Sequence, residues 1–166
     1  MNKTSFGTND VLTEALQKYS GMVRKICFMY LRNYADVEDV FQEVFLKLLQ
    51  RDIPFENDEH IKAWLCRITI NKCKDLCKDY FRKNTCSIED LELPFKDKKE
   101  NHLMTAVLSL PPKYKDVIYL FYYEEYSVPQ IAKLLHQKEN TIYSNLHRAR
   151  EVLKRKLGGL EYVYDY

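Results

Sequence analysis

Apolar residues recur at spacings of three and four along most of the chain, and this period predicts helices. The first run covers residues 11–30 and predicts one helix or two in succession. Asn33, just after the run, marks its end. Further runs cover residues 36–50 and, after a stretch that contains a proline, about residues 58–80. Only four Gly and five Pro occur in the chain, so we expect helix almost throughout.

The apolar faces of two of these helices name residues expected in a core. Each face follows the helical period, so its members lie on one side of the helix. The expected core residues are Val37, Val40, Phe41, Val44, Phe45 and Leu48 on the first of the two helices, and Ile61, Trp64, Leu65 and Ile68 on the second.

Residues 84–100 interrupt the helical pattern and divide the chain. This stretch carries a proline among five acids and three lysines, which is typical of a linker. A length of 166 residues suits one ordinary domain or two small ones. We therefore predict an all-α protein with two small helical domains, residues 1–83 and 101–166, joined by a linker over 84–100.

The segment from Ser127 to Gln130 predicts the start of a helix. A hydroxyl followed three residues later by an amide forms a capping box, and Pro129 falls in the first turn, where its missing N–H costs nothing. After a turn at 136–138, another helix begins near Asn140. Its apolar seam is Ile142, Leu146, Ala149 and Leu153. Helix, tight turn and helix is the arrangement that places a second helix in a DNA major groove.

The net charge of +2 hides two basic blocks. Residues 62–83 and residues 127–157 each carry seven cations against two acids, which leaves +5 in each block. Two separate basic surfaces suit contacts with a polyanion such as DNA. A solvated helix face is the plainer interpretation of either block taken alone.

Three groups of side chains are candidates for binding. Asp39, Gln42, Glu43 and Leu46 form a stripe away from the predicted core, which suits a basic, helical protein partner or a merely solvated face. Residues 64–78 interleave cations with aromatic and apolar groups, and Phe55 precedes them, as single-stranded nucleic acid requires, although Trp64 fits a core equally well.

The third group lies on the last helix. Opposite its seam are Asn140, Ser144, His147 and Glu151, flanked by Tyr143, Arg148, Arg150 and Arg155, which can match base edges and phosphates or form an ordinary polar surface.

Other classes of protein find little support. Cys73 and Cys77 lie one helical turn apart, but a metal site needs more ligands, so we expect free thiols, no metal and no cofactor. No nucleophile or acid–base cluster indicates an enzyme or a small-molecule substrate. Residues 1–10 lack the apolar core of a secretion signal, and no run approaches the roughly 20 apolar residues that span a bilayer, so we expect a cytoplasmic protein without membrane contact.

Three segments together resemble a known family. Residues 36–46, DVEDVFQEVFL, resemble the region 2.2 helix of the small extracytoplasmic-function (ECF) sigma factors of the sigma-70 family. Residues 64–71, with Trp64-Leu65, Arg67-Ile68 and Asn71, are similar to regions 2.3 and 2.4. Residues 127–150, which end in LHRAR, are similar to region 4.2. The resemblance extends from residue 11 to residue 157.

This resemblance implies an RNA polymerase sigma factor, which binds core RNA polymerase and directs promoter recognition, melting of the -10 element and initiation. It assigns the β′ clamp coiled coil as the partner of Asp39, Gln42, Glu43 and Leu46. It assigns the -10 element to Phe55, Trp64, Arg67, Asn71, Lys72 and Lys74. Of these, Phe55 and Asn71 would hold a flipped base. It assigns the -35 element to Asn140, Tyr143, Ser144, His147, Arg148 and Arg150. The helix near 114–122 would meet the β flap, and an anti-sigma factor is a further partner that the family allows.

The chain departs from the family pattern in its last two helices. His136 and Asn140 stand where the family has Gly, and both types tolerate left-handed backbone better than most residues. Lys138 replaces the usual Ser cap, and Tyr143 replaces a basic residue, so the -35 preference should differ. The alternative function is a helix-turn-helix regulator that binds duplex DNA as a homodimer without replacing sigma on polymerase. Such a regulator has no use for the stripe on residues 39–46. We assign no function to residues 160–166.

Overall fold

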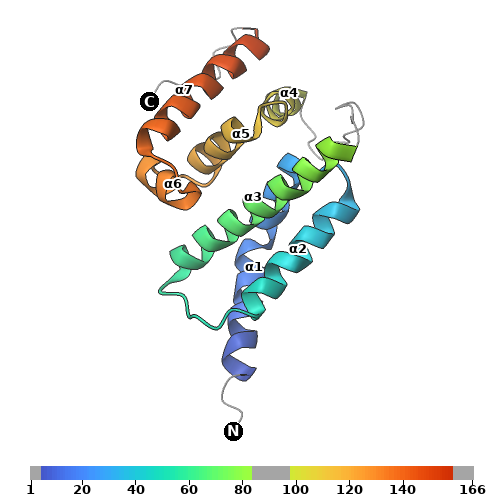
Figure 1. Ribbon diagram of the computed structural model, residues 1–166, viewed down its shortest axis with the longest axis vertical. Helices are drawn as coiled ribbons and strands as arrows, with labels where there is room; N and C mark the ends of the chain where they lie inside the picture. Colours follow the sequence, from blue (N-terminus) through green and yellow to red (C-terminus); the bar gives the residue numbers. More distant parts are fainter. Residues whose placement is uncertain (1–4, 84–97, 159–166) are drawn as a thin grey trace. The chain divides into compact units, whose positions relative to one another are not determined.

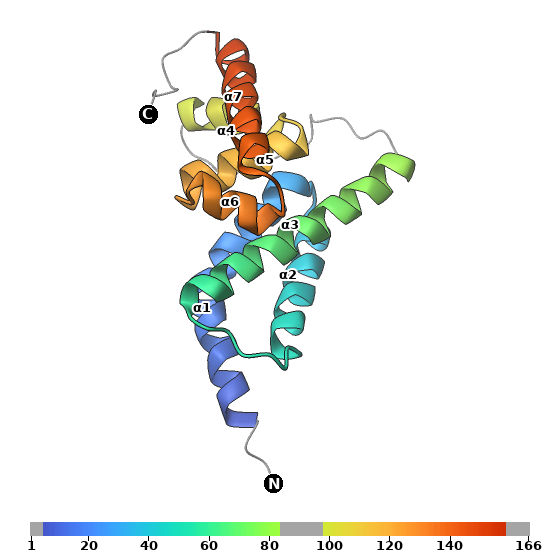
Figure 2. The same ribbon diagram turned by 60° about the vertical axis from the view of Figure 1, so that its left-hand side comes forward.

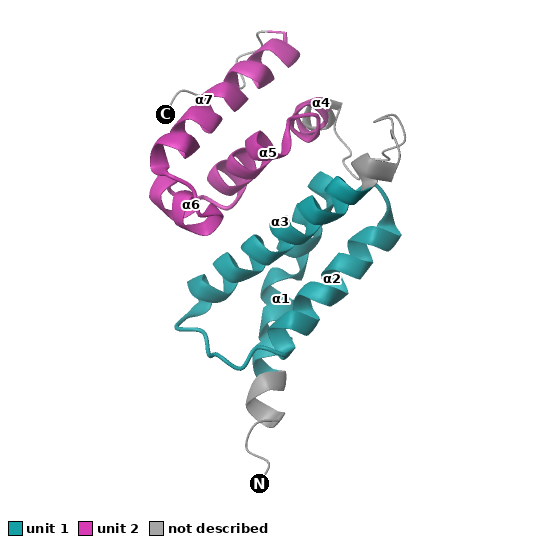
Figure 3. Ribbon diagram, in the orientation of Figure 1, with its two compact units in different colours: residues 1–85 teal, residues 86–166 magenta. Residues whose placement is uncertain are grey.

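The computed structural model describes residues 5–83 and 98–158, and the side chains within 10–79 and 102–158 (Figure 1). In these ranges every regular element is a helix, which confirms the predicted all-α class. The chain divides into two compact units, Met1–Thr85 and Cys86–Tyr166 (Figure 3).

Within residues 5–83, the first unit contains three helices: α1 Ser5–Tyr30, α2 Tyr34–Leu49 and α3 Asp58–Lys83. Figures 1 and 2 show that α1 and α3 run in the same direction and α2 runs against both. The predicted break at Asn33 is confirmed, because its side-chain oxygen accepts a bond of 2.8 Å from the Asp36 N–H and caps α2. Residues 11–30 lie in one continuous helix.

The core of the first unit confirms the face predicted for α2 at all but one position and corrects the face predicted for α3. Phe41 is half-buried beneath the Arg24 guanidinium, 3.9 Å from the ring centroid. Ile61, Trp64 and Ile68 are also only half-buried. The residues of α3 that are buried are Leu65, Cys66, Thr69, Ile70 and Cys73. The Trp64 ring instead packs against Phe55 and Arg51 at the edge of the unit, a placement that the apolar period alone does not reveal.

Sulfur atoms line the contact between α1 and α3. The Cys66 Sγ lies 3.5 Å from the Met22 Sδ, and the Cys77 Sγ lies 3.3 Å from the Tyr30 carbonyl oxygen. A hydrogen bond with Cys27, together with burial, raises the pKa of the Cys73 thiol. The four cysteines within the described side chains are therefore free thiols packed as small apolar groups, and Cys86 lies outside the described residues.

Within residues 98–158, the second unit contains four α-helices and one π-helix. They are α4 Lys98–Leu108, α5 Pro112–Ile118, η2 Tyr119–Tyr123, α6 Val128–Leu135 and α7 Glu139–Lys156. The side chains of Val117, Leu120, Ile131, Ile142 and Leu146 form the centre of its core. The linker expected over 84–100 lies outside the described residues except for its last three, which begin α4.

The helix-turn-helix has the predicted ends. The Ser127 N–H donates to the Gln130 Oε1 at 2.9 Å, and the Gln130 N–H donates to the Ser127 Oγ at 3.4 Å, so the capping box is confirmed. His136 ends α6 in left-handed backbone, with φ of 53°. Asn140 instead lies inside α7 and needs no left-handed conformation. Lys138 precedes α7 as its N-cap without a side-chain hydrogen bond to the helix.

The sequence did not predict the π-helix. In η2 the Glu124 N–H bonds to the Tyr119 carbonyl oxygen at 3.2 Å, five residues back, and the Tyr119 hydroxyl donates to the Glu124 carboxylate at 2.5 Å. Glu125 then takes φ of 57° and turns the chain toward α6. The extra residue in this turn brings Tyr122 and Tyr123 to the surface.

Candidate nucleic-acid interface

The α2 stripe faces away from the core of the first unit. Asp39 and Gln42 are exposed, and Leu46 keeps 53% of its surface in water. Glu43 is half-exposed because it pairs with α3: its Oε1 lies 2.6 Å from the Lys72 Nζ. The structure thus brings together two residues that the sequence assigned to different surfaces.

A basic stripe follows the outer face of α3. Arg67 and Asn71 are exposed, Lys74 is half-buried, and their spacings of four and three place them on one side of the helix. Burial lowers the pKa of Lys74, and the charge of Lys78 lowers it further. Lys78, four residues after Lys74, extends the stripe by one turn. The sequence placed it among the interleaved cations of residues 64–78 but did not assign it to the -10 element. Lys72 lies off this stripe, toward α2.

An aromatic cluster surrounds the start of α3. Phe55 packs against Trp64 with ring centroids 5.5 Å apart and an interplanar angle of 69°, and against His60 at 5.2 Å. The Arg51 guanidinium lies 4.3 Å from the Phe55 centroid and 5.3 Å from that of Trp64. Asn71 follows Trp64 by seven residues, two helical turns, so both face the same side of α3. The sequence named Phe55 and Trp64 but missed Arg51 and His60.

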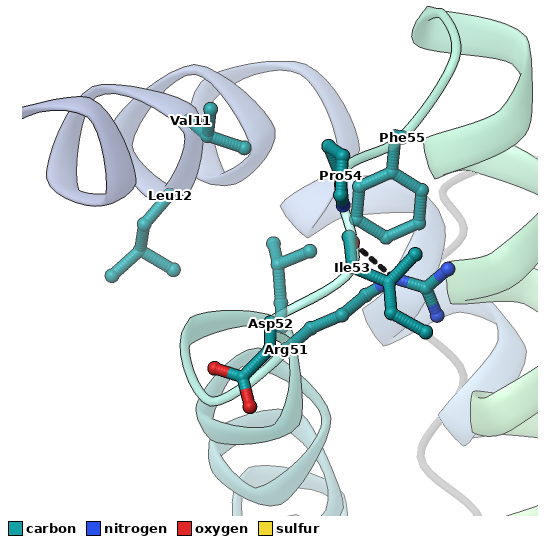
Figure 4. Close-up of a pocket in the computed structure, with 8 residues that line it drawn as sticks. Val11, Leu12, Arg51, Asp52, Ile53, Pro54 and Phe55 are labelled. Carbon is teal, nitrogen blue, oxygen red and sulfur yellow. Dashed lines mark hydrogen bonds between the residues drawn. The ribbon is translucent and has the colours of Figure 1, made fainter. Parts of the chain in front are cut away.

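The loop that carries Phe55 also borders an open pocket of about 280 Å³ (Figure 4). Arg51 crosses this loop, and its Nε donates to the Ile53 carbonyl oxygen at 2.9 Å (Figure 4). The pocket is lined by Val11, Leu12, Leu48, Arg51, Asp52, Ile53, Pro54 and Phe55. The bond from Arg51 and its stacking on two rings hold the loop in place while Phe55 stays half-exposed.

The outer face of α7 carries five of the six residues assigned to duplex DNA. Its seam of Ile142, Leu146, Ala149 and Leu153 is buried, as predicted. The exposed residues are Asn140, Tyr143, Ser144, His147 and Arg148. Amides, hydroxyls and an imidazole can meet base edges from this face, and Arg148 can meet a phosphate. Asn145 is buried beside the seam, which the sequence interpretation did not foresee.

Arg150 is engaged within the second unit. Its Nε donates to the Tyr122 hydroxyl at 2.7 Å, and its guanidinium carbon lies 5.6 Å from the centroids of both Phe121 and Tyr122. These contacts join α7 to η2. The side chain is half-buried, unlike the other five residues assigned to the -35 element.

Neither a cluster of metal ligands nor a membrane-spanning helix is found in the described part of the chain. Among residues 5–83 and 98–158, no group of three or more His, Cys, Asp or Glu is placed to hold a metal ion. None of the helices described there is long and apolar enough to cross a membrane.

Comparison with known proteins gives consistent matches in both units. Residues 15–85 match the family model for sigma-70 region 2, and residues 101–153 match the model for sigma-70 region 4. The ECF RNA polymerase sigma factor SigW of Bacillus subtilis is 26% identical over an alignment of 173 positions, gaps included, which covers 93% of this chain and 92% of that protein. The RNA polymerase sigma factor SigV of Bacillus subtilis is 25% identical over 154 residues, covering 90% and 93%.

A solved structure supports the same fold. It is the sigma factor RpoE of Bartonella quintana in complex with the anti-sigma factor NepR, with a TM-score of 0.73 and 20% identity. The match covers 88% of this chain and 96% of that one. At 20% identity this structural similarity shows the fold alone.

Proposed function

Because this chain belongs to the sigma-70 family as an RNA polymerase sigma factor of the ECF type, we propose that its α2 stripe binds core polymerase and that α3 and α7 contact promoter DNA. The single observation that supports this most strongly is the stripe of Asp39, Gln42, Glu43 and Leu46, which lies outside the core with a large apolar side chain exposed. Folding of the first unit gives no reason for an exposed Leu at the end of a stripe that carries two acids. A protein partner with basic and apolar side chains does.

At the -10 element, we assign base capture to the aromatic cluster and Asn71. Phe55 and Trp64 offer flat surfaces to an unstacked base, and the Asn71 amide offers a donor and an acceptor. Arg67 and Lys74, on the same face, suit the phosphates of a single strand. Binding of a flipped base offsets the few kcal/mol that unpairing requires, so melting needs no bond-making chemistry and no catalytic residue.

The second unit completes the proposed contacts. The outer face of α7 would enter the major groove of the -35 element. The segment 114–122 of α5 and η2, with Tyr122 exposed, would meet the β flap. We assign residues 1–83 to polymerase and -10 binding, 84–100 to the linker and 101–166 to -35 binding. The protein would act in the cytoplasm, and an anti-sigma factor, such as the one bound to RpoE, is a further proposed partner.

Run-off transcription with purified core polymerase on genomic fragments tests this function. The full chain is expected to yield specific transcripts that core polymerase alone does not give. Asp39→Ala with Gln42→Ala should lower both its affinity for core polymerase and the yield of transcript. Gln17→Ala, the same type of change on an exposed position of α1, is the matched control and should leave both unchanged.

The same variants separate the sigma factor from a regulator that binds duplex DNA without replacing sigma. For such a regulator, core polymerase would give no specific transcript with either protein, and the α2 double variant would bind DNA like the wild type. Full activity of that variant, or failure of the wild-type chain to bind sigma-free polymerase, would overturn the proposed function.

A further inference from the structure

The first two turns of α7 carry no cation. Residues 139–146 read ENTIYSNL, with Lys138 before them and Arg148 as the next basic residue. In a helix-turn-helix, the amino-terminal residues of the second helix are those that contact base edges. The commonest specific contact there is Arg or Lys bound to guanine through its O6 and N7. No side chain within these two turns can make that contact.

The exposed side chains of these two turns suit A·T pairs instead. Asn140 and Ser144 lie one turn apart, opposite the buried seam. A side-chain amide can bind adenine through N6 and N7 together. Tyr143 keeps 57% of its surface exposed on one flank, where the ring offers apolar area to a thymine methyl group. Glu139 lies in the first turn, where the positive end of the helix dipole stabilises a carboxylate. This residue therefore needs no contact with a DNA base to explain its position.

The two arginines that follow are placed for other tasks. Arg150 lies on the same flank as Tyr143, two turns further on, but it is bound to the Tyr122 hydroxyl and packed on two aromatic rings. It positions α7 against η2. Arg148 is exposed on the opposite flank, where it can meet a phosphate.

From this arrangement we propose that the second unit reads an A·T element, with Asn140 bound to an adenine and Tyr143 packed on the methyl group of a neighbouring thymine. Arg148 contributes backbone contact without sequence preference. The proposal rests on the proposed function, and it adds the bases that this site selects.

Two selections test the proposal with the full chain. In the first, the purified protein alone selects from a duplex library with a randomised upstream element. In the second, holoenzyme made with core polymerase transcribes the same library placed upstream of a start site found by run-off. Both should enrich an adenine and an adjacent thymine. Each variant named below is at an exposed position, and an unchanged thermal melt will show that it is folded.

Four variants assign the bases to residues. Asn140→Ala should reduce the preference for adenine at one position by roughly tenfold and leave the others intact. Tyr143→Arg should replace thymine by guanine at its position, whereas Tyr143→Phe should keep thymine. Arg148→Ala should weaken binding to all sequences by a similar factor.

The outcomes also separate this proposal from the function on which it rests. Guanine enriched at positions that Asn140→Ala and Tyr143→Arg leave unchanged would overturn the A·T reading. Enrichment of A·T by the protein alone, with no transcript from any template, would overturn the sigma function and retain the base assignment. Transcription without any enrichment would overturn the base assignment and retain the sigma function, and absence of both enrichment and transcript would overturn both.

Discussion

Asp116 is a carboxylic acid buried at the centre of the second unit, with 1% of its surface exposed. Burial raises the pKa of this carboxyl from 3.8 to about 8. Between about pH 4 and pH 8, the folded protein therefore keeps the proton on this carboxyl, whereas the unfolded chain has lost it. Stability from this group is greatest at low pH and falls by about 1.4 kcal/mol per pH unit across that window.

Asp116→Asn should remove this pH dependence, because an amide resembles the protonated acid at every pH. The variant is expected to gain stability over the wild type steadily from pH 5 to pH 8, measured by urea unfolding of the second unit. If the two stability curves ran parallel over this range, the carboxyl would carry its ordinary charge in the fold.

Asn71 separates single-strand from duplex binding at the scale of one side chain. Asn71→Ala should weaken holoenzyme binding to a promoter with a preformed -10 bubble more than to the closed duplex, by roughly 1–3 kcal/mol, because only an unstacked base can reach its amide. Asn140→Ala is the matched control in the other unit, and it should weaken both templates alike when both contain the -35 element. Equal losses for Asn71→Ala on the two templates would exclude base capture.

At the scale of an element, the capping box at Ser127 sets the start of α6 and hence the angle at which the chain enters the helix-turn-helix. Ser127→Ala leaves the Gln130 N–H without its side-chain partner and should lower the free energy of unfolding by about 1 kcal/mol. Chemical denaturation measures this change. Thr141→Ala, at an exposed position in α7, is the control and should not destabilise the unit.

Elements were predictable where their causes are local. The helix break at Asn33, the capping box at Ser127 and the seam of α7 each depend on residues within a few positions of one another, so the sequence predicted them. The buried face of α3 depends instead on contacts with a helix far away in the sequence, such as that of Cys66 with Met22, and the apolar period alone placed Trp64 inward.

The candidate site was predictable to a similar extent. Its exposed residues on α2, α3 and α7 follow from helical spacing. Contacts between elements do not, because spacing along one helix says nothing of its neighbour. The Glu43–Lys72 pair, the Arg51 side chain stacked on Phe55 and the bond from Arg150 to Tyr122 all join different elements, and each was found only in the structure.

For the whole molecule, charge decides how binding responds to salt. A net charge of +2 would give little attraction to DNA, but each of the two basic blocks carries a local +5. Neutralised phosphates release counterions, so the logarithm of the binding constant falls with the logarithm of salt concentration by about 0.9 per phosphate contact. The salt slope of promoter binding therefore counts the cations that touch the backbone.

Arg148→Ala should reduce the magnitude of this slope by about 0.9, the value of one phosphate contact, and should weaken binding to a similar extent on every promoter sequence. Promoter binding by holoenzyme, measured between roughly 50 and 200 mM salt, gives the slope. Lys25→Ala removes an equal charge from an exposed position of α1 outside both basic blocks, so it should leave the slope unchanged. A slope that fell equally in both variants would mean that overall charge, and not a phosphate contact at Arg148, governs the response.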